Sequence, residues 1–316
     1  MGLEGDEHAT PGGMSLAPYD DLPGVLRRLQ ALGPVHTYGS SVEGRPLWAV
    51  RVGASNDRRV LVTAAIHGIE YIGTRVALRL AESLADRPLA AEVWVAPVLN
   101  PDAYARTWRD GGAGSVGALR KNARGVDLNR NFPLPWGMRP SAIPLAGSSD
   151  PRAATFRGAT PLSEPETRAL AELVLRVEPQ VSANLHSFMG TLIPARVTHR
   201  TEWAAYSRML RGFRAGRGGV PFPRLGSLVG DVFTGELEDW QHHVVSCWAV
   251  CIELFPVLAS LAQHLRAPDS FWRFNPREPG RTEARDAAGV HALLHAGLQE
   301  RRPPSRAGSN TCLEAW

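Results

Sequence analysis

The sequence predicts one α/β domain with a central mixed, largely parallel β-sheet and helices on both faces. Three observations carry this prediction. Short apolar runs typical of strands alternate with helical runs along the chain. The strand, helix and strand over 59–98 are long enough to form a crossover between parallel strands. The 316 residues, 44% of them hydrophobic and 21% charged, have the composition of a globular protein with a full core.

The first half of the predicted domain follows from hydrophobic periodicity. A helix over 19–32 carries leucines and Val25 on one stripe and stops before Gly33-Pro34. A second helix, over 72–85, has apolar residues at spacings of three and four. Runs rich in valine and other β-formers predict strands at 46–52, 59–65 and 92–98.

The composition at the start of the second half of the domain predicts a long functional loop. Residues 100–162 are dominated by Gly, Pro, Asn, Asp and Arg, and loops of this length are uncommon unless they serve a purpose. Ser163 with Glu166 then predicts a capping box that opens a helix reaching Val177. Strands are predicted at 181–187 and 247–255, and helices near 202–215 and 282–300.

Composition limits the partners and the location of the protein. The 35 basic residues exceed the 31 acidic ones by four and are scattered, so neither nucleic acid nor a membrane surface is predicted as a partner. The chain has no signal peptide and no apolar run of about 18 residues, which predicts a soluble, cytoplasmic protein. We expect flexible ends at 1–17 and 301–316, with one folded domain over 18–300.

Three residues predict a metal site at the carboxyl ends of strands. His67 and Glu70 follow the run at 59–65 directly, and His186 lies near the end of 181–187. In open α/β sheets, ligands bind in the crevice outside these strand ends. Two imidazoles and one carboxylate form a catalytic zinc set that leaves the fourth position for water. One Zn²⁺ per chain is therefore predicted.

The run from Asp127 to Pro133 predicts a clamp for a carboxylate. It places Asn129 and Arg130 side by side, and a guanidinium forms two parallel hydrogen bonds with a carboxylate while the amide adds another donor. Arg120 is a second cation close by in sequence.

Taken together, these motifs resemble the zinc carboxypeptidases of the carboxypeptidase A type, as a bacterial member of that family. The resemblance covers residues 18 to 300, and seven runs occur in family order. They are His67 to Glu70, Asn100-Pro101-Asp102, Arg120-Lys121-Asn122, Asp127 to Pro133, Leu185-His186-Ser187, Asp239-Trp240 and Cys251 to Leu254.

The resemblance implies a role for each matching residue. His67, Glu70 and His186 match the zinc ligands, and Asp127 matches the acid that orients a ligand histidine. Glu253 matches the catalytic glutamate.

The same resemblance implies that Arg120 stabilises the oxyanion and that Asn129 and Arg130 grip the terminal carboxylate of the substrate. The activity implied is metal-assisted hydrolysis that removes a C-terminal residue from a peptide. Residues 18–300 would then form the catalytic domain.

Two positions depart from the family pattern. Asp231 stands where the digestive members carry a tyrosine on a mobile loop, and Phe233 could cover the substrate by packing instead. Glu238 stands where the family faces the last side chain of the substrate. A carboxylate there would favour a basic or diamino side chain through direct pairing.

Other functions stay open from the sequence. A murein-peptide amidase of the same family would cut next to a diamino acid, which suits Glu238. The aspartoacylase and succinylglutamate desuccinylase group has similar motifs and hydrolyses N-acyl amino acids. A pseudoenzyme that binds peptide C-termini is the alternative outside the enzymes, although competent residues occupy the ligand and base positions.

Overall fold

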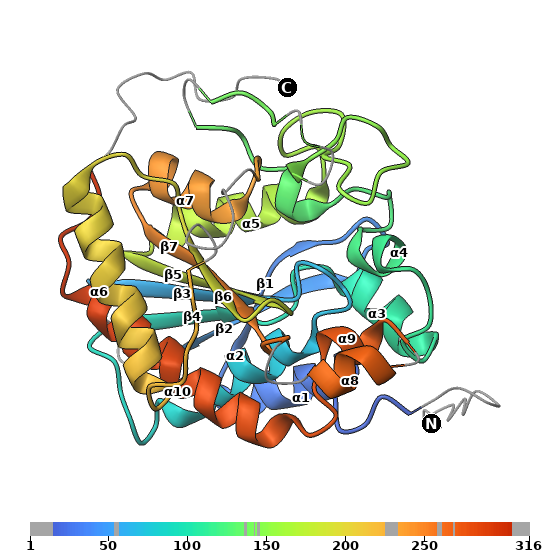
Figure 1. Ribbon diagram of the computed structural model, residues 1–316, viewed down its shortest axis with the longest axis horizontal. Coiled ribbons are helices and arrows are strands. Elements are labelled where there is room, and N and C mark those ends of the chain that lie inside the picture. Colours follow the sequence, from blue (N-terminus) through green and yellow to red (C-terminus); the bar gives the residue numbers. More distant parts are fainter. Residues whose placement is uncertain are drawn as a thin grey trace.

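A seven-stranded mixed sheet forms the centre of the protein (Figure 1). The computed structural model describes residues 15–53, 57–135, 138–141, 143, 146–224, 233–257, 261–267 and 269–304. The strands lie in the order β1 (Val35–Ser40), β2 (Pro46–Val52), β4 (Glu92–Ala96), β3 (Arg59–Ala64), β5 (Val181–Ser187), β7 (Trp248–Leu254) and β6 (Thr191–Pro194).

The predicted fold class is confirmed, with parallel pairing in the middle of the sheet. β4, β3, β5 and β7 pair in parallel, whereas β1, β2 and β6 join by antiparallel pairing at the two edges. Because the parallel strands share one direction, their carboxyl ends lie along one edge of the sheet.

Helices cover both faces of the sheet (Figure 1). One core cluster joins the sheet to α1, α2, α6 and α10, and the other joins it to α5 and α7. Within β3, Val60 and Val62 belong to the first cluster and Leu61 to the second, as expected when side chains alternate between faces. These helices span α1 (Leu22–Leu32), α2 (Tyr71–Ser83), α5 (Pro165–Val177), α6 (Arg200–Gly216), α7 (Leu237–Val245) and α10 (Pro279–Leu298).

The stretch over 100–162, predicted as one long loop, is interrupted by short helices. This stretch contains α3 (Pro101–Arg109), α4 (Val116–Arg120) and the short 3-10 turn η1 (Leu128–Arg130). The α3 helix is stabilised by Asn100, whose side chain accepts a hydrogen bond from the Ala103 backbone N–H at 3.2 Å. Polar residues therefore cap short helices here instead of forming open loop.

The predicted capping box at Ser163 is also wrong. Helix α5 is preceded by Glu164 as its N-cap, without a side-chain cap bond. The Ser163 hydroxyl instead donates to the Glu164 carboxylate at 2.8 Å, and Asn131 accepts the Glu164 backbone N–H at 3.3 Å. Asn131, from a distant loop, thus satisfies a backbone N–H at the start of α5.

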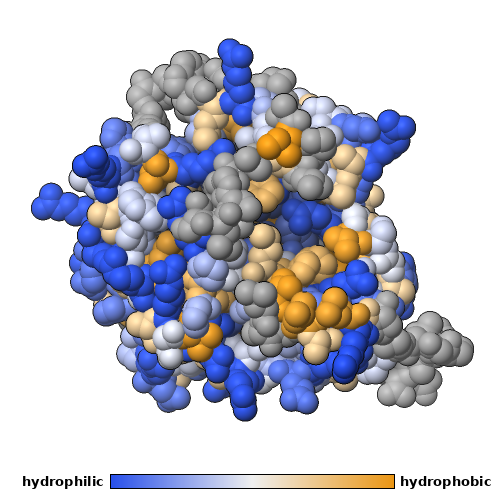
Figure 2. All heavy atoms as spheres, in the orientation of Figure 1, coloured by the Kyte–Doolittle hydropathy of each residue, from blue (hydrophilic) through white to orange (hydrophobic). Residues whose placement is uncertain are grey.

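Two short helices close the end of the molecule near the strand ends. They are α8 (Leu261–Arg266) and α9 (Phe271–Phe274). On the face seen in Figure 2, apolar side chains gather over these helices beside a hydrophilic hollow. Leu261 and Leu265 on α8 are 48% and 77% exposed.

Within the described part of the chain, every helix is too short or too polar to span a membrane.

Candidate active site

The three predicted metal ligands meet at the carboxyl ends of β3 and β5. His67 follows β3, His186 lies in β5, and the two strands are neighbours in the sheet. The ligand atoms of His67, Glu70 and His186 all lie within 4.8 Å of one another, and each residue is at most 3% exposed. Residues more than 100 positions apart in sequence therefore form one buried cluster.

The Nδ1 atoms of both imidazoles face the carboxylate of Glu70. The Nδ1 atom of His67 lies 2.8 Å from Oε1 of Glu70, and Nδ1 of His186 lies 3.1 Å from Oε2. Ligands on a tetrahedral ion with bonds of about 2.1 Å stand roughly 3.4 Å apart, so these spacings are close to those of a shared zinc ion. The donor set and its geometry therefore fit one Zn²⁺.

The turn that carries His67 packs directly against α3. A Cβ atom at Gly68 would lie 2.3 Å from Cβ of Ala103, so glycine is required for this close approach. Asn100 donates from its side-chain amide to the backbone oxygen of Ile66 at 3.3 Å and to that of Arg120 at 3.4 Å. The Asn100-Pro101-Asp102 motif thereby fixes the turn next to the chain segment that ends α4.

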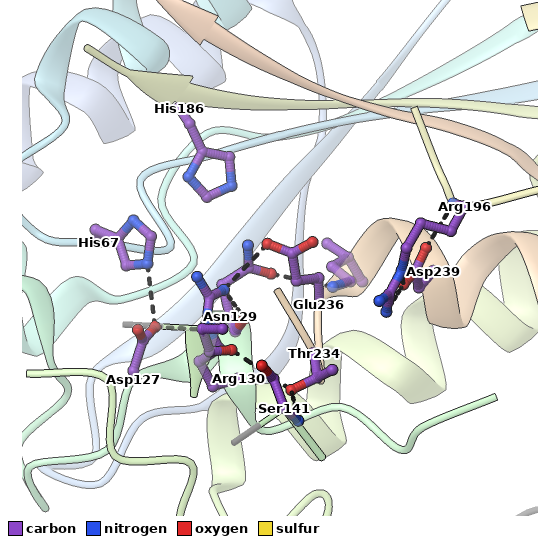
Figure 3. Close-up of polar contacts among 12 residues, drawn as sticks. His67, Asp127, Asn129, Arg130, Ser141, His186, Arg196, Thr234, Glu236 and Asp239 are labelled. Carbon is purple, nitrogen blue, oxygen red and sulfur yellow. Dashed lines mark hydrogen bonds and ion pairs between the residues drawn. The ribbon is translucent and has the colours of Figure 1, made fainter. Parts of the chain in front are cut away.

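Asp127 connects the cluster to Arg120 and to the clamp. Its Oδ1 lies 3.1 Å from Nε2 of His67 (Figure 3) and also accepts the Asn129 backbone N–H at 3.1 Å. Its Oδ2 accepts from Nε of Arg120 at 2.7 Å. A buried carboxylate with three donors holds the His67 ring in one orientation, with Nδ1 turned towards the cluster.

The charged groups around Glu70 keep its side chain ionised. Burial opposes its ionisation, but the two neighbouring imidazoles hold the pKa of Glu70 at about 2. Burial and Arg120 disfavour protonation of His67, yet the Glu70 and Asp127 carboxylates outweigh them and raise the pKa of the imidazole. For Asp127, burial is likewise overcome, chiefly by Arg120, and the pKa is lowered. The site is therefore organised around two permanent negative charges.

Glu253 lies beside this cluster on β7. It is paired across the sheet with His186, and its Oε2 accepts the Met189 backbone N–H at 3.4 Å. Burial raises the pKa of Glu253 above its usual value and nearby Glu70 adds to this, against the opposing effect of the two imidazoles and Arg120. A carboxylate with a raised pKa beside the three candidate metal ligands is suited to accept a proton.

One pocket collects most of the predicted site residues. It has a volume of about 180 Å³ and is lined, among others, by His67, Arg120, Asn129, Arg130, His186 and Glu253. Pockets for drug-sized ligands measure roughly 300–1,000 Å³, so this one suits a single residue.

The two clamp residues are anchored by the segment that opens α7. The side-chain oxygen of Asn129 accepts the Leu237 backbone N–H at 3.0 Å, which fixes the orientation of the amide. The Nη1 atom of Arg130 donates to the Asn129 backbone oxygen at 2.6 Å and to Glu236 at 3.1 Å. Its buried Nε has no hydrogen-bond partner in the described structure. The protein thus holds both side chains in place, and Arg130 keeps one donor that has no partner among the described residues.

The acidic side chains near the clamp differ in their placement from the sequence-based expectation. Glu236, which sequence reasoning missed, lines the pocket, whereas Glu238 is buried in the first turn of α7 and is not among the described lining residues. The only sequence signal for Glu236 was its place two residues before Glu238. Asp231, the position of the absent tyrosine, lies outside the described residues. Phe233 does line the pocket, and the guanidinium of Arg130 stands 4.8 Å from its ring centre.

Known proteins resemble part of this chain in sequence. The family model described as zinc carboxypeptidase matches residues 26–210. Human mast cell carboxypeptidase A is 28% identical over 49% of this chain and 40% of its own length. Murein peptide amidase A of Escherichia coli K12 is 31% identical over 53% of this chain and 65% of its own length. The chain thus spans less than two thirds of each of these curated relatives.

Solved structures share the fold. Bovine thrombin-activatable fibrinolysis inhibitor, solved in complex with tick carboxypeptidase inhibitor, superposes with a TM-score of 0.69 over 89% of this chain and 98% of its own, at 18% identity. The murein-tripeptide amidase of Escherichia coli O157 gives a TM-score of 0.55 over 85% and 95% of the two chains, at 22% identity. Because the family model covers more than half of the sequence, the chain belongs to the zinc carboxypeptidase family.

Proposed function

We propose that this protein is a zinc-dependent hydrolase that removes a C-terminal residue from peptides with a free carboxylate. The observation that carries the proposal is a single pocket lined by two candidate metal ligands, a carboxylate with a raised pKa, and a preformed carboxylate clamp. Metal ligands alone would suit many hydrolases, but the clamp selects a substrate that ends in a carboxylate.

We assign the metal to His67, Glu70 and His186. All three are buried and converge, and together they supply the nitrogen and oxygen donors that catalytic zinc takes from proteins. When bound there, zinc would polarise the substrate carbonyl and make an attacking water more acidic. Asp127 would keep the His67 ring in its ligating orientation through the bond to Nε2.

The remaining roles follow from position and charge. Glu253 would take a proton from the attacking water, for which its raised pKa makes it a better base, and would then return the proton to the leaving amine. Arg120 donates a hydrogen bond to Asp127 and lines the same pocket. It would stabilise negative charge on the carbonyl oxygen. Asn129 and Arg130 would hold the terminal carboxylate.

A murein-peptide amidase is the second candidate. It is favoured by the similarity to two Escherichia coli amidases and by the carboxylates at the start of α7, which suit a diamino acid. Hydrolysis of N-acyl amino acids, or binding of peptide C-termini without turnover, are further alternatives that the same experiment separates.

Product analysis tests these functions directly. The zinc-loaded protein would be incubated with acyl dipeptides ending in Lys, Arg, Phe or Leu, with a murein tripeptide, and with N-succinylglutamate. We expect release of the C-terminal residue, fastest from the dipeptides with basic ends, measured by mass spectrometry. Equal or faster release of Phe would discard the basic preference. Cleavage of the murein peptide alone would establish the amidase, and release of succinate alone the acylase.

Loss of the clamp gives a separate prediction. Arg130→Ala removes the paired hydrogen bonds to the terminal carboxylate, so we expect KM to rise by roughly 30-fold or more, as for other desolvated charge pairs. Zinc content should stay at the wild-type level, since Arg130 contacts none of the proposed ligands in the described hydrogen bonds. Steady-state kinetics with metal analysis measures both, and an unchanged KM would contradict the clamp.

A further inference from the structure

A second cavity lies outside the active site, between α8 and the start of α10 (Figure 1). Its volume is about 630 Å³, within the range of roughly 300–1,000 Å³ that is usual for small-molecule sites. The described residues that line this cavity and those that line the active-site pocket have no member in common. A molecule bound in the cavity would therefore occupy a site of its own.

Three guanidinium groups surround the cavity. Arg266 comes from α8, Arg277 from the segment between α9 and α10, and Arg281 from the first turn of α10. Of the described lining residues, only Glu278 is acidic. No hydrogen bond or ion pair joins any of the three guanidinium groups to another described residue. Because arginine stays protonated in proteins, three positive charges minus one negative charge give the cavity wall a net charge of +2.

The next acids along α10 do not neutralise this charge, because they have other partners. Oε2 of Glu283 lies 2.7 Å from Nε of Arg75, and Oδ1 of Asp286 lies 2.5 Å from Nε of Arg217. Like charges that converge on one cavity without a counter-charge repel one another. An anion placed between the three guanidinium groups would turn this repulsion into attraction.

Gln263 on α8 ties the walls of the cavity together. Its side-chain amide donates to the backbone oxygens of Trp272 at 2.7 Å and Asn275 at 2.8 Å. Its side-chain oxygen accepts the Arg277 backbone N–H at 3.2 Å. The guanidinium of Arg277 lies over the Trp272 ring, 4.4 Å from its centre. This part of the wall is therefore in place before a ligand arrives, which lowers the entropic cost of binding.

Apolar residues form much of the remaining wall. Phe255, Ala267 and Pro276 are buried and line the cavity between the charged groups. An inorganic ion would leave this apolar surface in water, whereas the body of an organic molecule would cover it. A phosphate monoester combines such a body with a charge of about −2 near neutral pH. Its oxygens also match the paired donors of a guanidinium.

We propose that this cavity binds a small organic phosphate monoester. The phosphate group would lie among Arg266, Arg277 and Arg281 and offset the net charge of +2, while the organic part covers the apolar wall. Such binding does not depend on peptide hydrolysis, so a protein that cleaves no peptide would still bind the phosphate ester here.

Titration calorimetry of the whole chain with phenyl phosphate tests this site. We expect Arg277→Gln and Arg281→Gln each to raise the Kd by roughly tenfold or more, because each removes charge-assisted hydrogen bonds to the phosphate. Arg281→Lys, which keeps the charge without the paired donors, should raise it less. The matched control is Arg273→Gln, which changes an exposed arginine of α9 outside the described lining and should bind like wild type. All of these arginines are exposed, so each variant should keep the wild-type Tm.

Arg130→Ala separates this cavity from the active site, where a phosphate would also find a guanidinium. We expect this variant to bind phenyl phosphate like wild type. Loss of binding in Arg130→Ala but not in Arg281→Gln would place the ligand in the active-site pocket and overturn the proposal. So would an affinity that neither Arg277→Gln nor Arg281→Gln changes by more than about twofold, or the absence of binding at millimolar concentrations.

Two further probes test the class of the ligand. Inorganic phosphate lacks the apolar body, so we expect it to bind at least roughly tenfold more weakly than phenyl phosphate. Equal binding of the two would contradict the role of the apolar wall. Phenylmalonate carries its two charges on separate carboxylates, and tighter binding of this probe than of phenyl phosphate would assign the cavity to dicarboxylates instead.

Discussion

Glu253→Gln is expected to lower kcat by about 10²–10⁴-fold, the range that a positioned general base contributes. Glutamine has nearly the same shape, so the Met189 backbone N–H keeps an acceptor and β7 keeps its packing. The amide cannot take up a proton, however, so the attacking water loses its base and the leaving amine its acid. The effect should therefore appear in kcat, while KM for a C-terminally free peptide stays close to that of wild type.

Metal analysis makes this experiment specific. The ligand atoms of the proposed zinc set come from three other residues, so Glu253→Gln should purify with the zinc content of wild type. Glu172→Gln, which removes the same charge from an exposed position on α5, is the matched control and should keep full activity. A Glu253→Gln enzyme that is active, or one that has lost its zinc, would contradict the role of proton acceptor.

The strands were predictable because burial on both faces leaves a continuous apolar run. The runs at 46–52, 59–65 and 92–98 match β2, β3 and β4 to within two residues at the ends. The edge strands were harder to predict. In β1, half-buried and exposed residues are mixed, and β6 has only four residues, so neither carries a clear periodicity. These two segments form strands because they pair with a neighbouring strand, and local sequence does not predict such pairing.

The residues of the candidate site also differ in how well the sequence predicts their positions. His67, His186 and Glu253 belong to strand ends, so the parallel order β3, β5, β7 suffices to bring them together. Glu236 is different, because its place in the pocket depends on the path of the chain that leads into α7. That path is fixed by long-range bonds, such as the one from the Phe132 backbone N–H to the oxygen of Gly235 at 3.1 Å. No local pattern predicts such a contact.

Removing one candidate ligand should have a larger effect than any other change. His186→Gln leaves only His67 and Glu70 to hold the ion, and two ligands are fewer than catalytic zinc sites use. We therefore expect zinc content to fall from about one per chain to a small fraction, and peptide hydrolysis to be lost with it. The exposed His295, replaced in the same way, should leave both at the wild-type level.

Thermal unfolding gives the same prediction a second, activity-free measurement. A ligand present at 1,000 times its Kd stabilises a folded protein by about 4 kcal/mol, which for a domain of this size corresponds to a change in Tm on the order of 10 °C. A chelator should therefore lower the Tm of wild type and of His295→Gln but leave that of His186→Gln unchanged. The variant should also start below the metal-free wild type, because the buried Oε2 of Glu70 loses its 3.1 Å partner and a buried charge without a partner is costly. If His186→Gln instead kept a chelator-sensitive Tm and one zinc per chain, the ion would have to be bound elsewhere, and the assignment of the cluster would be wrong.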